Sequence, residues 1–313
     1  MSELLQNIDA RTRLAGTNKL EMLMFSLGED SRSKRTETFG INVFKVREVM
    51  RTPEITRAPD MPSAVEGMVS LRGVLVPVID LVRYTGVQTE TRAEVMIVTE
   101  YNGRTQGLLV AAVDTILRID WTMMKVPPAM LAQKMDGLIT AVTELADGRL
   151  VMMMDVEKVL ADTSGVNDDD LFQHLKPVEK EGRAVFFADD SSTARKQIAR
   201  TLDALGLRHQ QAVNGRQAWE QLQQLAEQSA ARGQALSSSL HLVLTDVEMP
   251  EMDGYMLTRC IKSDARFKGI PVLMHSSLSG NSNSQLGRSV GVDEYVSKFE
   301  PQRLAATLSR MLA

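Results

Sequence analysis

The sequence contains a single cysteine, Cys260, so no disulfide can form within the chain. A lone thiol is typical of a protein in a reducing compartment. The first ten residues lack the basic-then-apolar pattern of a secretory signal peptide. No apolar run approaches the roughly 18 residues needed to cross a bilayer. We therefore expect a cytoplasmic protein without direct membrane insertion.

An excess of positive charge is also missing, because Lys+Arg number 36 against Asp+Glu 40 and the net charge is -4. This balance gives no basic footprint for nucleic acid. The sequence has no glycine-rich nucleotide loop, and its histidines are dispersed along the chain: His174, His209, His241 and His275. We expect no nucleic-acid partner, no histidine metal cluster and no self-phosphorylation from ATP.

The length of 313 residues suggests two domains. The first half contains strand-length apolar segments at 19–27, 39–44, 68–81, 93–114 and 138–156. Asn102-Gly103 and Asp147-Gly148 are hairpin signals within this half, and Arg72-Gly73 separates two apolar runs. Regularly spaced short strands with tight turns predict an antiparallel sandwich or small barrels.

Residues 162–183 break this rhythm, because they are polar, charged and contain Pro177. We interpret them as a linker, with a helical turn at Asp170 to Lys176. The segment 225–240 is interpreted as a surface loop.

The second half, 184–313, alternates apolar strands with helical stretches. The predicted strands are 184–188, 207–213, 240–245, 270–275 and 293–297, and the predicted helices are 192–205, 215–230, 254–264, 281–290 and 301–312. Such alternation predicts a doubly wound parallel sheet, whose ligands bind beyond the carboxyl ends of the strands.

Polar side chains collect at those strand ends: Asp189, Asp190, Asp246, Ser276, Ser277 and Lys298. A strand-end aspartate alone often just caps the next helix. A set drawn from four strands indicates a shared site. Packed carboxylates need a compensating cation, and oxygen ligands favour Mg²⁺. Lys298 and Ser276 could hold phosphoryl oxygens while Asp246 accepts the phosphoryl group as an acyl phosphate.

These residues, with Met249-Pro250, Asp253-Gly254 and Tyr295, resemble the receiver domain of two-component response regulators. The resemblance implies a flavodoxin-like (βα)5 fold with Asp246 as phosphoacceptor. It also implies Mg²⁺ held by Asp190, Asp246 and the backbone carbonyl of Glu248, with Asp189 helping through water. Ser276 and Tyr295 would be the pair that reorients on phosphorylation, and Ser277 and Lys298 would bind the phosphoryl group.

The chain departs from the receiver pattern at two positions. Phe299 follows Lys298 where receivers usually have a cis proline, so we expect a differently shaped turn. Glu248 places an acid two residues after the phosphoacceptor. Its charge could repel the phosphoryl group or steer water towards it, and either effect bears on the lifetime of the phosphorylated state.

The stretches FGINVFKVREVM (39–50) and GMVSLRGVLVPVIDL (67–81) resemble the CheW-like coupling domain of bacterial chemotaxis. The resemblance covers 18–161 and implies an all-β domain of two small five-stranded barrels. Residues 1–17 resemble the helical lead-in of the fused form. Together the two halves resemble the CheV type of coupling protein.

This resemblance implies a scaffold that joins methyl-accepting chemoreceptors to the histidine kinase CheA, associated with membrane chemoreceptor arrays. Glu48, Val49 and Arg72 match positions used for receptor contact. Val49 could instead belong to the core, and Glu48 and Arg72 could be ordinary solvated charges.

Three functions follow from these features. The first is a coupling scaffold regulated by phosphorylation of Asp246, and the second is a phosphate sink that drains phosphoryl groups from CheA. The third is an enzyme, a Mg²⁺-dependent phosphatase with Asp246 as nucleophile and Glu248 as second acid. We expect a non-enzyme, because no cap or substrate pocket is evident in the sequence.

Overall fold

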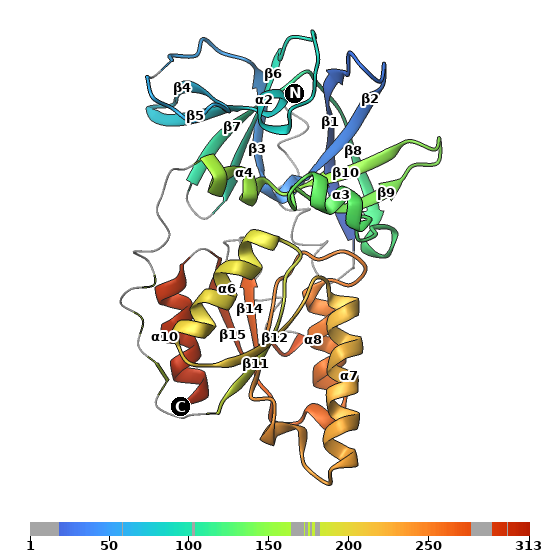
Figure 1. The fold of residues 1–313 in the computed structure, drawn as a ribbon, viewed down its shortest axis with the longest axis vertical. Helices are drawn as coiled ribbons and strands as arrows, with labels where there is room; N and C mark the ends of the chain where they lie inside the picture. The colour runs from blue at the N-terminus through green and yellow to red at the C-terminus, as the bar shows by residue number, and fades with distance from the viewer. Residues whose placement is uncertain are drawn as a thin grey trace. The chain divides into compact units, whose positions relative to one another are not determined.

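The computed structural model describes residues 19–57, 59–101, 104–163, 172, 175, 177–178, 182–276, 290–298 and 300–313. They form two compact units, the first with strands β1–β10 and the second with strands β11–β15 (Figure 1). The lead-in predicted at 1–17 lies outside the described residues. So do Ser277, Phe299 and all but the last residue of the helix predicted at 281–290.

The first unit consists of two five-stranded sheets, as the double small-barrel prediction requires. One sheet has the order β8-β1-β2-β10-β9, with β1 (Lys19–Glu29), β2 (Thr36–Asn42), β8 (Ala112–Asp120), β9 (Ile139–Glu144) and β10 (Leu150–Met154). The other has the order β3-β6-β7-β5-β4, with β3 (Val46–Arg51), β4 (Val65–Leu71), β5 (Val74–Asp80), β6 (Val95–Tyr101) and β7 (Arg104–Val110).

Both faces of the β3–β7 sheet are apolar, which explains why its strands are so rich in valine and isoleucine. Val76 and Val78 of β5 point into a core formed by this sheet alone. Ile79, the next residue, points into a core shared with Phe25 and Phe39 of the other sheet. Successive side chains of a strand face opposite sides, so a continuous apolar run serves two cores.

The purely antiparallel arrangement expected for this unit is wrong in one respect, because each sheet contains a parallel pair. β5 pairs parallel with β7, and β10 pairs parallel with β2. Only hairpin neighbours are obliged to run antiparallel. Helix α2 (Leu81–Thr85) and strand β6 lie between β5 and β7 in the chain, which gives room for a crossover.

The turn between β4 and β5 confirms the interpretation of Arg72-Gly73. Both residues have positive φ, 51° for Arg72 and 84° for Gly73. Two such residues match the turn that best fits the twist of a two-residue hairpin. The predicted strand 39–44 ends early, at Asn42, because the Asn42 side chain accepts a hydrogen bond from Phe44 N at 3.0 Å and starts a short helical turn.

Short helical elements complete the first half: η1 (Val43–Lys45), η2 (Trp121–Met123), α3 (Ala129–Lys134) and α4 (Val156–Thr163). Asp80 caps α2 by accepting hydrogen bonds from Val82 N and Arg83 N, so its carboxylate has a structural role. No helix among the described residues is long and apolar enough to span a membrane.

The second unit is a parallel five-stranded sheet in the order β12-β11-β13-β14-β15, which confirms the doubly wound prediction. Its strands are β11 (Ala184–Ala188), β12 (Arg208–Ala212), β13 (Leu242–Thr245), β14 (Val272–Ser276) and β15 (Glu294–Ser297). Its helices are α6 (Ser192–Ala204), α7 (Gly215–Ala231), α8 (Gly254–Ser263) and α10 (Pro301–Leu312), with turns η3 (Leu236–Ser238) and η4 (Ala265–Phe267).

The helices cover both faces of this sheet (Figure 1). Phe186 of β11 packs in the core beneath α7 and α8, and its neighbour Phe187 packs in the core beneath α6 and α10. The strand ends are thereby held between two helical layers, at the edge where such folds bind ligands.

The interpretation of 225–240 as a surface loop is right for the exposed residues 232–235 and 237–239 and wrong for the rest. Helix α7 continues to Ala231, and Leu236 and Leu240 are buried in the core beneath α7 and α8. These two core leucines were not recognised in the sequence because most of their neighbours are polar.

Part of the predicted linker packs within the second unit. Arg200 lies over the Phe172 ring, 4.2 Å from its centre, and Val178 N donates to Leu205 O at 3.0 Å. Leu175 and Val178 pack against the core beneath α6 and α10. The helical turn predicted at 170–176 lies mostly outside the described residues.

Candidate functional site

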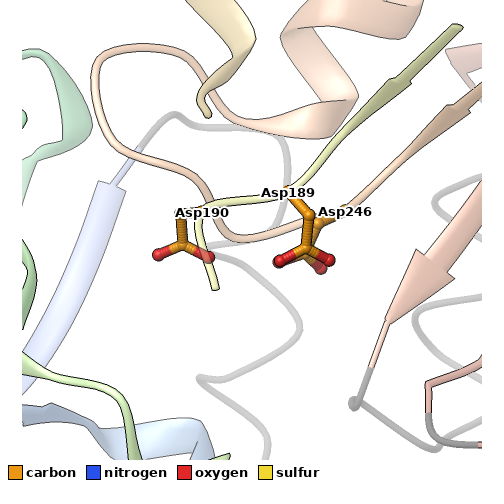
Figure 2. Close-up of side chains that lie close together, drawn as sticks. All are labelled: Asp189, Asp190 and Asp246. Carbon is orange, nitrogen blue, oxygen red and sulfur yellow. The ribbon is translucent and has the colours of Figure 1, made fainter. Parts of the chain in front are cut away.

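Three aspartates meet at the carboxyl edge of the parallel sheet. Asp189 and Asp190 follow β11, and Asp246 follows β13 (Figure 2). Each offers one carboxylate oxygen within 4.8 Å of the others. Asp189 and Asp246 are buried and Asp190 is half-buried. Hard carboxylate oxygens grouped in this way are a donor set suited to a divalent cation such as Mg²⁺.

Lys298, directly after β15, joins the two buried carboxylates. Its Nζ lies 2.8 Å from Asp246 Oδ2 and 2.9 Å from Asp189 Oδ2. Its side chain is only 2% exposed. A buried charge is stable only when it is paired with an opposite charge. The carboxylates of Asp189 and Asp246 and the ammonium of Lys298 therefore stabilise one another as one buried group.

The loop carrying the aspartate pair is fixed by backbone contacts. Asp189 Oδ1 accepts from Ser191 N at 2.9 Å, and Ser191 caps α6. Arg195 Nη1 donates to the carbonyl oxygens of Asp189 and Asp190, each at 2.9 Å. Sequence reasoning missed Arg195, although its position in the first turn of a helix that follows an acidic loop was a usable signal.

Asp246 is equally constrained. Val247 N donates to Asp246 Oδ1 at 2.6 Å, which leaves Oδ2 facing Lys298. A Cβ on Gly254 would lie 1.9 Å from Asp246 O, so only glycine fits where α8 approaches this strand end. Asp253 caps α8 through Met256 N. The Asp253-Gly254 pair therefore positions α8 against the site.

Ser276 and Tyr295 lie on the adjacent strands β14 and β15, and their side chains share a hydrogen bond. Burial raises the pKa of Tyr295. The hydrogen bond from Ser276 lowers this pKa, and the charges of Asp246 and Glu248 raise it further. Glu248 is itself buried, at 8% exposure, and its charge is one of those that act on Tyr295.

In the first unit, two of the three predicted contact residues pair with each other. Arg72 Nη2 lies 2.8 Å from Glu48 Oε2, with the arginine 72% exposed. Both line a shallow groove with the apolar side chains of Leu71 and Val74. Val49 packs against the shared core, which supports the core interpretation for that residue.

Two families match the chain. The CheW-like domain matches residues 21–164, and the response regulator receiver domain matches residues 185–309. The chain is similar to chemotaxis protein CheV1 of Helicobacter pylori, with 28% identity covering 100% of this chain and 99% of that protein. It is 31% identical to chemotaxis protein CheV3 of the same organism, over 88% of each.

The chain belongs to the CheV family. It is thus a chemotaxis protein with a CheW-like domain and a receiver domain, as the motifs predicted. A coupling module and a receiver module account for both halves of the chain, in keeping with the adaptor proteins of this family and not with the phosphatase alternative. A solved structure similar to it is scaffolding protein TtCheW from Thermoanaerobacter tengcongensis, with 27% identity, 44% of this chain and 84% of that chain covered, and a TM-score of 0.39.

Removing the Lys298 ammonium should strongly destabilise the receiver of this CheV chain. We expect Lys298→Met to cost about 3–5 kcal/mol, because two buried carboxylates lose their shared cation. Adding Asp189→Asn should restore part of the loss, since the amide oxygen keeps the bond from Ser191 N. Urea unfolding followed by circular dichroism, with the receiver transition fitted separately, measures both.

Arg310→Met is the matched control. It breaks the exposed pair between Arg310 and Glu294 and should cost less than about 1 kcal/mol. Equal losses for Lys298→Met and Arg310→Met would show that the buried contact does not hold the site together.

Proposed function

We propose that the chain is a chemotaxis scaffold that couples chemoreceptors to the histidine kinase CheA and that phosphorylation of Asp246 regulates this coupling. The main support for this proposal is the buried Asp246 carboxylate, which pairs with Lys298 and lies close to Asp189 and Asp190. The same chain also has a CheW-like domain. We place the protein in the cytoplasm, at membrane-associated receptor arrays.

Each residue of the site has a defined part in this proposal. An Asp246 oxygen attacks the phosphorus of the kinase's phosphohistidine, the P–N bond breaks, and the histidine leaves with the bonding electron pair. Val247 N already donates to Oδ1 and orients the carboxylate. Lys298 and Ser276, and by resemblance Ser277, hold phosphoryl oxygens.

The residues present fit a magnesium ion. Asp189, Asp190 and Asp246 offer hard oxygen ligands close to one another, and we propose the backbone carbonyl of Glu248 as a further ligand. Bound Mg²⁺ would neutralise negative charge on the phosphoryl oxygens during transfer.

The CheW-like half supplies the binding surface. Arg72, in the turn between β4 and β5, is exposed and forms an ion pair with Glu48 of β3. Val74 and Leu75, the next apolar residues, are 54% and 69% exposed. A charged pair beside exposed apolar side chains has the composition of a protein interface, and we propose that Glu48 and Arg72 contact receptor or kinase, with Val49 supporting them from the core.

Phosphate transfer tests the phosphoacceptor. Labelled phosphate should pass from phosphorylated CheA to the wild-type chain in Mg²⁺, and both Asp246→Asn and chelation of Mg²⁺ should abolish labelling. Asp203→Asn removes an exposed receiver carboxylate and should leave labelling unchanged. Labelling of Asp246→Asn equal to wild type would show that the acceptor is another residue.

Receptor–kinase coupling tests the binding surface. Arg72→Glu should weaken recruitment to membranes containing receptor and CheA at least tenfold, because it reverses the charge of the exposed partner of Glu48. Arg118→Glu is the matched control, since Arg118 is also an exposed arginine paired with a half-buried glutamate, Glu21. Equal recruitment of all three proteins would rule out the Arg72 surface.

A phosphate sink is the second candidate, and Glu248 is the observation that favours it. A buried carboxylate two residues after Asp246 would shorten the life of the phosphorylated state if it repels the phosphoryl group or orients water. We expect Glu248→Gln to lengthen the half-life of labelled Asp246, while Glu227→Gln, an exposed change on α7, has no effect.

The two functions then separate by time and by coupling. A sink turns over faster than receptor–kinase activity changes, and its Asp246→Asn variant couples receptors normally under every phosphodonor condition. A regulated scaffold persists in the phosphorylated state and loses its phosphodonor response in Asp246→Asn. An unchanged half-life in Glu248→Gln would remove the support for the sink.

A further inference from the structure

A second tyrosine is buried beside the phosphoacceptor. Tyr255, the second residue of α8, is 1% exposed. Among the described residues its hydroxyl oxygen has no hydrogen-bond partner. Buried hydroxyls nearly always have one, so an orphan next to a functional site calls for a second state in which it is satisfied.

The neighbours of Tyr255 connect it to the site. It packs with Val247 and Met274, and Tyr295 packs against the same small cluster. Val247 directly follows Asp246, and Met274 lies two residues before Ser276 on β14. Tyr255 therefore belongs to the same small cluster as the residue that follows the phosphoacceptor, and Tyr295 packs against that cluster.

Tyr255 is held as a neutral donor. Burial raises its pKa, and the charges of Tyr295, Asp253, Glu248 and Asp246 raise that pKa further. The phenol thus keeps its proton and can donate it in a hydrogen bond.

Phosphorylation offers the neighbouring hydroxyl groups a new hydrogen-bond acceptor. A serine hydroxyl has one proton and two acceptor positions. The hydrogen bond between the Ser276 and Tyr295 hydroxyls lowers the pKa of Tyr295, as a bond donated by Ser276 would do. If Ser276 donates instead to a phosphoryl oxygen on Asp246, the Tyr295 oxygen can accept a hydrogen bond from another donor.

We propose that Tyr255 is a positioning residue of the phosphorylation switch, donating its hydroxyl proton to the Tyr295 oxygen in the phosphorylated receiver. The new bond stabilises the state in which Ser276 serves the phosphoryl group. This inference rests on the proposed function of Asp246 and extends the switch to a residue on α8. It assigns a state-dependent role to a hydroxyl that has no hydrogen-bond partner among the described residues of the unphosphorylated protein.

Beryllium fluoride, BeF3−, tests the proposal on the full chain as a phosphoryl mimic. Its affinity in the presence of Mg²⁺ is measured by ¹⁹F NMR titration, and the affinity for Mg²⁺ alone is measured by calorimetry. We expect Tyr255→Phe to weaken BeF3− binding about tenfold, the effect of one lost hydrogen bond, with the Mg²⁺ affinity unchanged. The melting temperature without BeF3− should be equal or higher, because an unsatisfied buried hydroxyl is gone.

Tyr84→Phe is the control, because it removes a tyrosine hydroxyl bonded to Asp162 in the first unit and should leave BeF3− affinity unchanged. In a Tyr295→Phe background the effect of Tyr255→Phe should disappear, since the acceptor is absent.

Equal BeF3− affinity in wild type and Tyr255→Phe overturns this inference alone. Weaker binding of both Mg²⁺ and BeF3−, with a lower melting temperature, also overturns it, because the role is then merely structural. A tenfold effect that persists in the Tyr295→Phe background overturns the assigned partner. Failure of the wild type to bind BeF3− with Mg²⁺ overturns the proposed function of Asp246 itself.

Discussion

The contact of the Lys298 ammonium with Asp189 and Asp246 is the constraint on which the rest of the second unit depends. It lies at the junction of three strand ends, and its three charges are almost fully removed from water. A single cation links the end of β15 to the ends of β11 and β13. A metal ion or phosphoryl group bound here, as we propose, would share or replace the contacts of that lysine, so the electrostatics of the empty and the occupied site are linked.

The two units bury their apolar strands in different ways. In the first, continuous apolar strands serve a sheet's own core on one face and a shared core on the other. This leaves polar and exposed apolar side chains at hairpin tips such as Arg72 and Leu75, where a partner can reach them. In the second, apolar strands lie between two helical layers, and the polar groups are confined to the strand ends.

The periodic parts of the fold could be predicted from the sequence. The parallel sheet was predictable because apolar strands and amphipathic helices alternate in the sequence. Once the strands were assigned, the polar residues at their carboxyl ends could be read directly from the sequence. The β10–β2 pairing could not be predicted, because nothing local in either strand encodes a partner more than a hundred residues away. The burial of Leu236 and Leu240 could not be predicted either, because polar residues surround them in the sequence. The grouping of Asp189, Asp246 and Lys298 followed from topology. The lack of a partner for the Tyr255 hydroxyl within the described part of the chain depends on packing that no motif records.

Arg195 holds the loop after β11 by donating to the carbonyl oxygens of Asp189 and Asp190, atoms that every residue possesses. This support does not depend on which side chains stand at the two positions, whereas the hydrogen bond from Ser191 N and the ion pair with Lys298 both need the Asp189 carboxylate. The half-buried position 190 is therefore the one that evolution can vary with less effect on the backbone of this loop.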